Sequence, residues 1–304
     1  MTSFHYPLPE QEPQSPWTDL SDEARSALTK VAIGSSVANQ LLQPDGLVNP
    51  EISPDFQMVA AASHRRYNSL FTEVPGYTSV PEFTDPEFSQ VDWQRLESGF
   101  MAYDQLGMSP ELVISIEGQP LDRWQTFYSN LRQYQDDHYP DSPHRLLRQN
   151  DGDGLFVNAQ MAEHWGELTP EQTHWSLAVI PTTIKAPALG VDYYGKGQNG
   201  LVSDDVASIL TELPINQLVH PTIESYLAFQ ASRIHANQQP IDDKIDGLFY
   251  YTWLRGNFTN SENNQVAPRG GWRPDFGQVF LVGRRVGNRV GDLGVRPEVR
   301  GEDL

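Results

Sequence analysis

The chain has 304 residues, and its 40 aspartates and glutamates against 21 lysines and arginines give a formal net charge of −19. This length accommodates one large domain or two ordinary ones, and a hydrophobic content of 38% excludes collagen and wholesale disorder. The negative charge argues against a nucleic-acid partner, because phosphate binding needs a basic surface. The absence of cysteine excludes disulfides, thiolate metal sites and cysteine nucleophiles.

The sequence predicts that residues 1–168 form a mixed region of helices and strands with a flexible, proline-rich arm at its start. The first 17 residues contain neither the basic segment nor the apolar core of a secretory signal, and no stretch approaches the roughly 20 apolar residues of a membrane span. We therefore expect no membrane span and, by default, a cytoplasmic protein. The patterns predict helices over 21–32, 91–106 and about 121–131, a strand over 112–116, and loops over 43–57 and 74–90.

The sequence predicts that residues 169–304 form a second domain, which is rich in short strands. Strands are expected over 175–181, 249–254 and 278–282, and helices over 204–212 and 222–234. Gly270 with Gly271, and Pro274 with Asp275, are interpreted as turns. The buried stripe of the last helix is expected to be Ile223, Tyr226, Leu227 and Ile234. These elements indicate an α+β protein with a domain boundary near residue 168.

No pattern in the sequence supports a metal site or a cofactor. The loop 150–154 has the sequence Asn-Asp-Gly-Asp-Gly, but it lacks the third ligand and the final glutamate of a calcium loop, so we interpret it as a polar turn. The histidine pairs that were considered lack the four-residue helical spacing of a zinc site. These pairs are His138 with His144 and His164 with His174.

The sequence also supports no catalytic residue. Asp242, Asp243 and Asp246 are expected in a solvated turn rather than as an acid/base pair. An enzyme of unrecognised type remains an alternative, and it would need a pocket that gathers distant groups such as His174, His220 and Asp242.

The C-terminal segment from Arg269 to Arg300 differs in charge from the rest of the chain, because it holds seven arginines and only three acids. It either docks onto the acidic remainder or presents a binding surface of its own. Within it, Val279 and Leu281 share one face of the expected strand, while Phe280 and Val282 share the other. If the first pair is core, the second pair is exposed, which is typical of a binding surface.

Three short motifs in this segment carry a resemblance to a known family. They are residues 269–272 (Arg-Gly-Gly-Trp), 288–289 (Asn-Arg) and 293–296 (Leu-Gly-Val-Arg). Together they resemble the last strands of C-type lectin folds of the formylglycine-generating-enzyme kind, and in particular the variable proteins of diversity-generating retroelements. The resemblance covers about 30 residues. It implies a C-terminal C-type-lectin-like domain over 169–304, preceded by the mixed α/β region over 1–168.

The resemblance also implies a function and a division of residues. The protein would be a ligand-binding display protein whose diversified surface holds a protein or glycan ligand, without enzyme activity, since the enzymes of this fold use active-site cysteines. A structural or assembly protein of a phage or mobile element is the alternative. The implied scaffold residues are Trp272, Gly277, Val279, Leu281, Leu293, Gly294, Val295 and Arg296. The implied ligand-binding residues are Arg273, Phe276, Phe280, Val282, Arg284, Arg285, Val286, Asn288 and Arg289.

Overall fold

The computed structural model describes residues 52–149 and 152–302. The predicted arm, the predicted helix over 21–32 and the first two residues of the loop 150–154 lie outside the described residues. The described residues belong to one compact unit that spans residues 48–304. None of its helices is long and apolar enough to cross a membrane.

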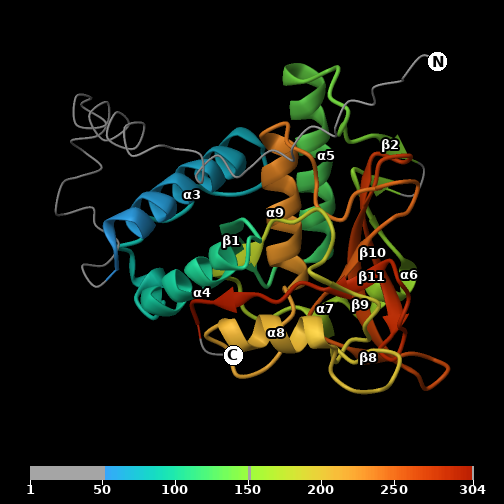
Figure 1. Cartoon of the computed structure of the whole chain (residues 1–304). Coiled ribbons are helices and arrows are strands. Elements are labelled where there is room, and N and C mark those ends of the chain that lie inside the picture. The colour runs from blue at the N-terminus through green and yellow to red at the C-terminus, as the bar shows by residue number, and fades with distance from the viewer. Residues whose placement is uncertain (1–51, 150–151, 303–304) are drawn as a thin grey trace, which may run out of the picture. The chain divides into compact units, whose positions relative to one another are not determined.

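The described residues form seven α-helices, a short 3-10 helix and several sheets (Figure 1), which makes the fold a mixed α+β fold. The helices are α3 (Pro54–Glu73), α4 (Trp93–Gln105), α5 (Leu121–His138), α6 (Ala159–Glu163), α7 (Trp165–Leu168), α8 (Asp204–Glu212) and α9 (Ile223–His235), and the 3-10 helix is η2 (Pro86–Phe88).

The largest sheet has seven strands in the order β4-β10-β9-β7-β11-β6, with β8 paired to β9. It is mixed, because β10 runs parallel to β4 and β11 runs parallel to β7. Its strands are β4 (Leu155–Val157), β6 (Ala188–Leu189), β7 (Tyr251–Trp253), β8 (Phe258–Thr259), β9 (Gln265–Arg273), β10 (Gln278–Arg285) and β11 (Leu293–Val295).

A second sheet has three antiparallel strands, β1 (Pro110–Glu117), β5 (His174–Pro181) and β12 (Val299–Arg300), in the order β1-β5-β12. A small hairpin joins β2 (Arg148–Gln149) to β3 (Gly152–Asp153). The predicted boundary near residue 168 lies inside the compact unit, and strands from its two sides pair, β1 with β5 and β4 with β10. The division into two domains stays a prediction.

Helix α9 lies at the centre of the packing and contacts β1, α3, α5 and β9 (Figure 1). It begins as predicted, because the Thr222 hydroxyl accepts a hydrogen bond from the amide of Ser225 at 3.0 Å. The four residues of the predicted buried stripe are buried, but burial extends all round the helix, since every residue of α9 except Arg233 is buried. A helix enclosed by neighbours on several sides loses the amphipathic pattern that the prediction assumed.

Most of the other predicted elements are confirmed, with one correction near the start of the described residues. The helices α4, α5 and α8 and the strands β1, β5, β7 and β10 lie where the patterns placed them. The predicted loop over 43–57 is wrong at its end, because α3 begins at Pro54. Ser53 accepts a hydrogen bond from the Phe56 amide, and proline suits the first helical position because it needs no donor there.

The predicted turn at Gly270 and Gly271 is also wrong, since both residues lie inside β9 with extended backbone. The two glycines are required by close packing on the two faces of the strand. A Cβ on Gly270 would overlap the ring of Tyr226, and a Cβ on Gly271 would lie 2.6 Å from Cδ1 of Tyr251. The turn expected at Pro274 is confirmed, and it closes at Gly277 with a φ of 57°.

Candidate functional site

The paired strands β9 and β10 divide the C-terminal segment into a buried face and an outer face. Val279 lies opposite Trp272 and Leu281 opposite Gly270, on the face that packs into the core. Because side chains alternate along a strand, the residues between them point outward. All eight residues expected to be scaffold are buried. They are Trp272, Gly277, Val279, Leu281, Leu293, Gly294, Val295 and Arg296.

The nine residues expected to bind ligand are all at least partly exposed, but they do not form one surface. Arg273, Phe276, Phe280, Val282 and Arg284 gather on the outer face of β9 and β10 or in the turn between them. Arg285 follows Arg284 directly, so it points to the opposite face, where it pairs with Glu262 at 3.1 Å. The other three lie in the loop after β10, and they are Val286, Asn288 and Arg289.

Other residues complete this outer surface, and the sequence analysis did not assign them to it. Phe156 of β4 lies opposite Phe280, and their ring centroids are 4.5 Å apart. Tyr251 covers Gly271 between Arg269 and Arg273. We call this surface the aromatic–arginine face. It consists of Phe156, Phe249, Tyr251, Arg269, Arg273, Phe276, Phe280, Val282 and Arg284.

Two guanidinium groups lie over the aromatic rings of this face. The guanidinium carbon of Arg273 is 4.0 Å from the ring centroid of Phe249 and 5.2 Å from those of Phe276 and Phe280. Its Nη1 also donates a hydrogen bond to the Tyr251 hydroxyl at 3.2 Å. The guanidinium carbon of Arg269 lies 3.9 Å from the ring centroid of Tyr251. Such contacts attract a cation to the ring and fix its orientation.

The arginines of the C-terminal segment fall into two groups. Four pair with carboxylates of the described residues, and these are Arg285, Arg289, Arg296 and Arg300. Arg269, Arg273 and Arg284 have no carboxylate of the described residues within ion-pair distance. Burial lowers the pKa of Arg269 to about 10, and the cations of Arg284 and Arg273 also lower it, while Tyr251 and the carboxylate of Asp292 raise it. Arg269 therefore stays charged at neutral pH.

The aspartates expected in a solvated turn are buried at two of three positions, which corrects that prediction. Asp242 is fully buried, Asp243 is almost fully buried, and only Asp246 is exposed. Asp242 accepts a hydrogen bond from Nη2 of the equally buried Arg296 at 3.1 Å. Burial raises the pKa of Asp242 and the Arg296 cation opposes that rise. A buried partner of opposite charge explains how the turn tolerates burial.

The histidines named for a metal site or a catalytic pocket are held by separate partners. His220 donates a hydrogen bond from Nε2 to the carbonyl of Tyr193 at 2.7 Å, and burial lowers its pKa to about 4, so it is neutral at pH 7. His138 stacks on Tyr134. Among the residues that the structure describes, no group of three or more histidines and acids is placed to hold a metal ion.

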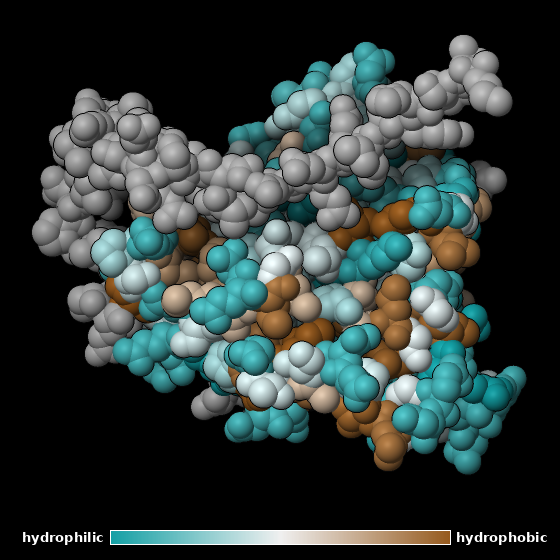
Figure 2. Space-filling view, in the orientation of Figure 1, coloured by the Kyte–Doolittle hydropathy of each residue, from teal (hydrophilic) through white to brown (hydrophobic). Residues whose placement is uncertain are grey.

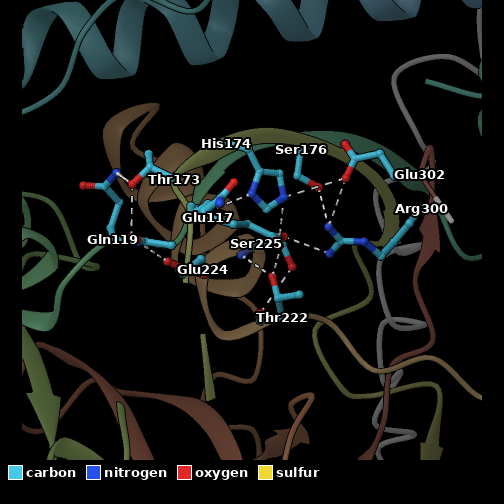
Figure 3. A network of polar contacts seen from close by, with 12 residues as sticks. Glu117, Gln119, Thr173, His174, Ser176, Thr222, Glu224, Ser225, Arg300 and Glu302 are labelled. Carbon is cyan, nitrogen blue, oxygen red and sulfur yellow. Dashed lines mark hydrogen bonds and ion pairs between the residues drawn. The ribbon is translucent and has the colours of Figure 1, made fainter. Parts of the chain in front are cut away.

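A buried polar network connects β1, β5 and β12 of the three-stranded sheet to α9 (Figure 3). Arg300 of β12 donates to Glu117 of β1 at 2.8 Å and to Ser176 of β5 at 2.6 Å. Glu224 of α9 accepts from the amide of Gln119, and burial raises its pKa to about 8. The network connects strands and helix, but the buried Oε2 of Glu224 and Nε of Arg300 have no hydrogen-bond partner in it.

Exposed apolar side chains on the side shown in Figure 2 lie among polar ones and form no continuous patch there in the described residues. Comparison of the chain with protein-family models, with curated proteins and with solved structures finds no match. The candidate site therefore rests on the geometry of the aromatic–arginine face.

Proposed function

We propose that this protein binds a macromolecular ligand, a protein or a glycan, through the aromatic–arginine face and catalyses no reaction there. The observation that carries the proposal is the cluster of Arg269, Arg273 and Arg284, three cations without a carboxylate partner among the described residues on an acidic chain. Arginine and aromatic side chains are the residues that most often supply binding energy at interfaces. The face contains no carboxylate or histidine that could move a proton.

The rigidity of the strands supports a binding role. The outer residues project from strands whose opposite face is packed against the core, so their positions are set before a ligand arrives. The exposed Phe276, at 40%, lies in the turn between the strands and offers apolar area at the edge of the face. A pre-organised surface of this kind loses little side-chain entropy on binding.

The resemblance to variable proteins of diversity-generating retroelements extends the proposal to a lectin-like display domain over 169–304. Pairing of β5 with the C-terminal β12 and the buried scaffold residues are compatible with it. Sequencing the DNA around the gene tests diversification. We expect a reverse transcriptase and a near-copy of the segment encoding 269–297 that differs only at adenines. Finding neither would remove diversification from the proposal.

Binding itself is tested with two probes, an array of glycans and a phage-displayed library of random dodecapeptides. The protein is compared with the double variant Arg273→Ser and Phe280→Ser, and with the control Arg285→Ser, whose side chain points away from the face. We expect ligands that bind the protein and the control but not the double variant, while circular dichroism shows all three folded. Ligands that bind all three equally would refute the proposal.

A further inference from the structure

The three unpaired arginines point to the charge of the ligand. The chain has nearly twice as many acids as lysines and arginines, yet Arg269, Arg273 and Arg284 lie together without a carboxylate partner among the described residues. Like charges side by side repel, and the cations of Arg284 and Arg273 add to the lowering of the Arg269 pKa, whose largest cause is burial. An anionic ligand would remove this repulsion, since charge complementarity is how an interface selects its partner.

The spacing of the arginines fits an extended polypeptide. Arg269 and Arg273 point outward from the same strand four residues apart, which places their Cα atoms about 13 Å apart along β9, and both guanidinium groups contact Tyr251 between them. Carboxylates four positions apart in an extended peptide have the same separation. Between the two arginines the face is apolar, because Gly271 is covered by Tyr251 and lies opposite Phe280.

We propose that the ligand is an extended acidic segment of a protein, with two carboxylates four positions apart and an apolar side chain midway between them. This inference rests on the proposed function of the same face. The carboxylates would pair with Arg269 and Arg273, and the apolar side chain would contact the partly exposed Phe280. Arg284, diagonal to Arg269 across the strand pair, would accept a further acid.

Two other classes of ligand fit the face less well. A neutral sugar binds by stacking on an open aromatic ring, but Tyr251 and Phe249 each already carry a guanidinium within 4.0 Å of the ring centroid. A nucleic acid or sulfated glycan is a long polyanion, which the net charge of −19 repels outside the face. A short acidic segment brings charge only where the arginines are.

The dodecapeptide selection tests this inference. Peptides enriched on the protein should contain the acid-apolar-acid pattern more often than the unselected library. A synthetic peptide with that pattern should bind about tenfold more weakly for each carboxylate changed to an amide, and also more weakly at high salt. Binding should be lost in the triple variant Arg269→Gln, Arg273→Gln and Arg284→Gln and retained in Arg285→Gln.

The single variant Arg284→Gln serves if the triple variant fails to fold, because Arg284 is exposed; it should weaken a peptide that carries the third acid. Three outcomes would overturn the acidic-segment inference and leave the proposed function standing: face-dependent peptides without acidic enrichment, amide peptides that bind equally well, or face-dependent binding of glycans such as heparin in place of peptides. Face-dependent binding of single-stranded DNA in place of both would overturn the inference and the proposed function, because the proposed ligand is a protein or a glycan. If no probe depends on the face, the proposed function fails, and the inference fails with it.

Discussion

Replacing Gly270 with alanine should destabilise the protein strongly, because β9 packs directly on α9 at this point. The added Cβ would lie 2.7 Å from Cζ of the Tyr226 ring and 2.8 Å from its Cδ1. Tyr226 is fully buried, and its hydroxyl is fixed by a hydrogen bond to Asp242 at 3.1 Å and another from Gln230 at 2.8 Å. The ring therefore cannot move aside without straining these bonds.

The expected loss follows from two opposing effects. Overpacking a core costs about 1–3 kcal/mol, and disturbing a hydrogen bond of Tyr226 costs about 1 kcal/mol more. Alanine reduces the freedom of the unfolded chain, which returns about 0.4–1 kcal/mol. We expect Gly270→Ala to lower the free energy of unfolding by about 2–3 kcal/mol.

Urea denaturation followed by circular dichroism measures this loss, and Gly287→Ala is the matched control. Gly287 is exposed, its φ is not positive, and a Cβ there would meet nothing within 4 Å. The control should leave stability unchanged or raise it by less than about 1 kcal/mol. A Gly270→Ala variant within about 1 kcal/mol of the control would refute the close-packing explanation of the glycine pair.

Three further predictions use the same denaturation assay. The pKa of Glu224 is about 8 in the folded protein against an ordinary value of 4.5, so the folded state binds more protons than the unfolded state between these values, and stability should fall as pH rises from about 5 to 8. Glu224→Gln should flatten this slope by up to about 1.4 kcal/mol per pH unit. An unchanged slope would contradict the raised pKa of Glu224. Arg296→Met should lower the free energy of unfolding by about 3–5 kcal/mol, because it leaves Asp242 buried without its cation. The double variant with Asp242→Asn should lose less than Arg296→Met alone, and an equal loss in the two variants would exclude coupling between Arg296 and Asp242. Thr222→Ala should cost about 1–2 kcal/mol through the lost cap to Ser225, and no loss would show the cap to be dispensable.

The elements that the sequence predicted well are those whose signals are local. Helix α8 begins at Asp204, directly after the cap Ser203, which accepts a hydrogen bond from the Val206 amide, and both its ends match the prediction. Helix α9 was placed correctly by its cap at Thr222, but its burial depends on neighbours from four other elements. Gly270 was misassigned because glycine permits both turns and close packing, and only the position of Tyr226 distinguishes them.

The candidate site was only partly predictable for the same reason. Alternation along one strand separated Phe280 from Val279, and the structure places them on opposite faces. Phe156 reaches the face through parallel pairing of β4 with β10, between segments more than a hundred residues apart, and no local pattern indicates such pairing. The resemblance implies that Arg284 and Arg285 both bind ligand, although neighbouring residues of a strand point in opposite directions.

The sequence allows two explanations of the seven C-terminal arginines, docking onto the acidic remainder of the chain or presenting a binding surface, and the two are compatible. Arg296 and Arg300 are buried and neutralised by acids of distant elements, so part of the segment does dock onto the acidic body of the protein. Arg296 also donates a hydrogen bond to Thr252 of β7, which pairs with Gly270 of β9, so this docking is connected to the strand that carries Arg269 and Arg273. Among the seven arginines of this segment, only Arg269, Arg273 and Arg284 lack a carboxylate partner among the described residues, so the unpaired charge of the segment lies on the aromatic–arginine face. An acidic partner would therefore meet attraction there and repulsion over much of the remaining surface, which restricts the orientation in which it can bind.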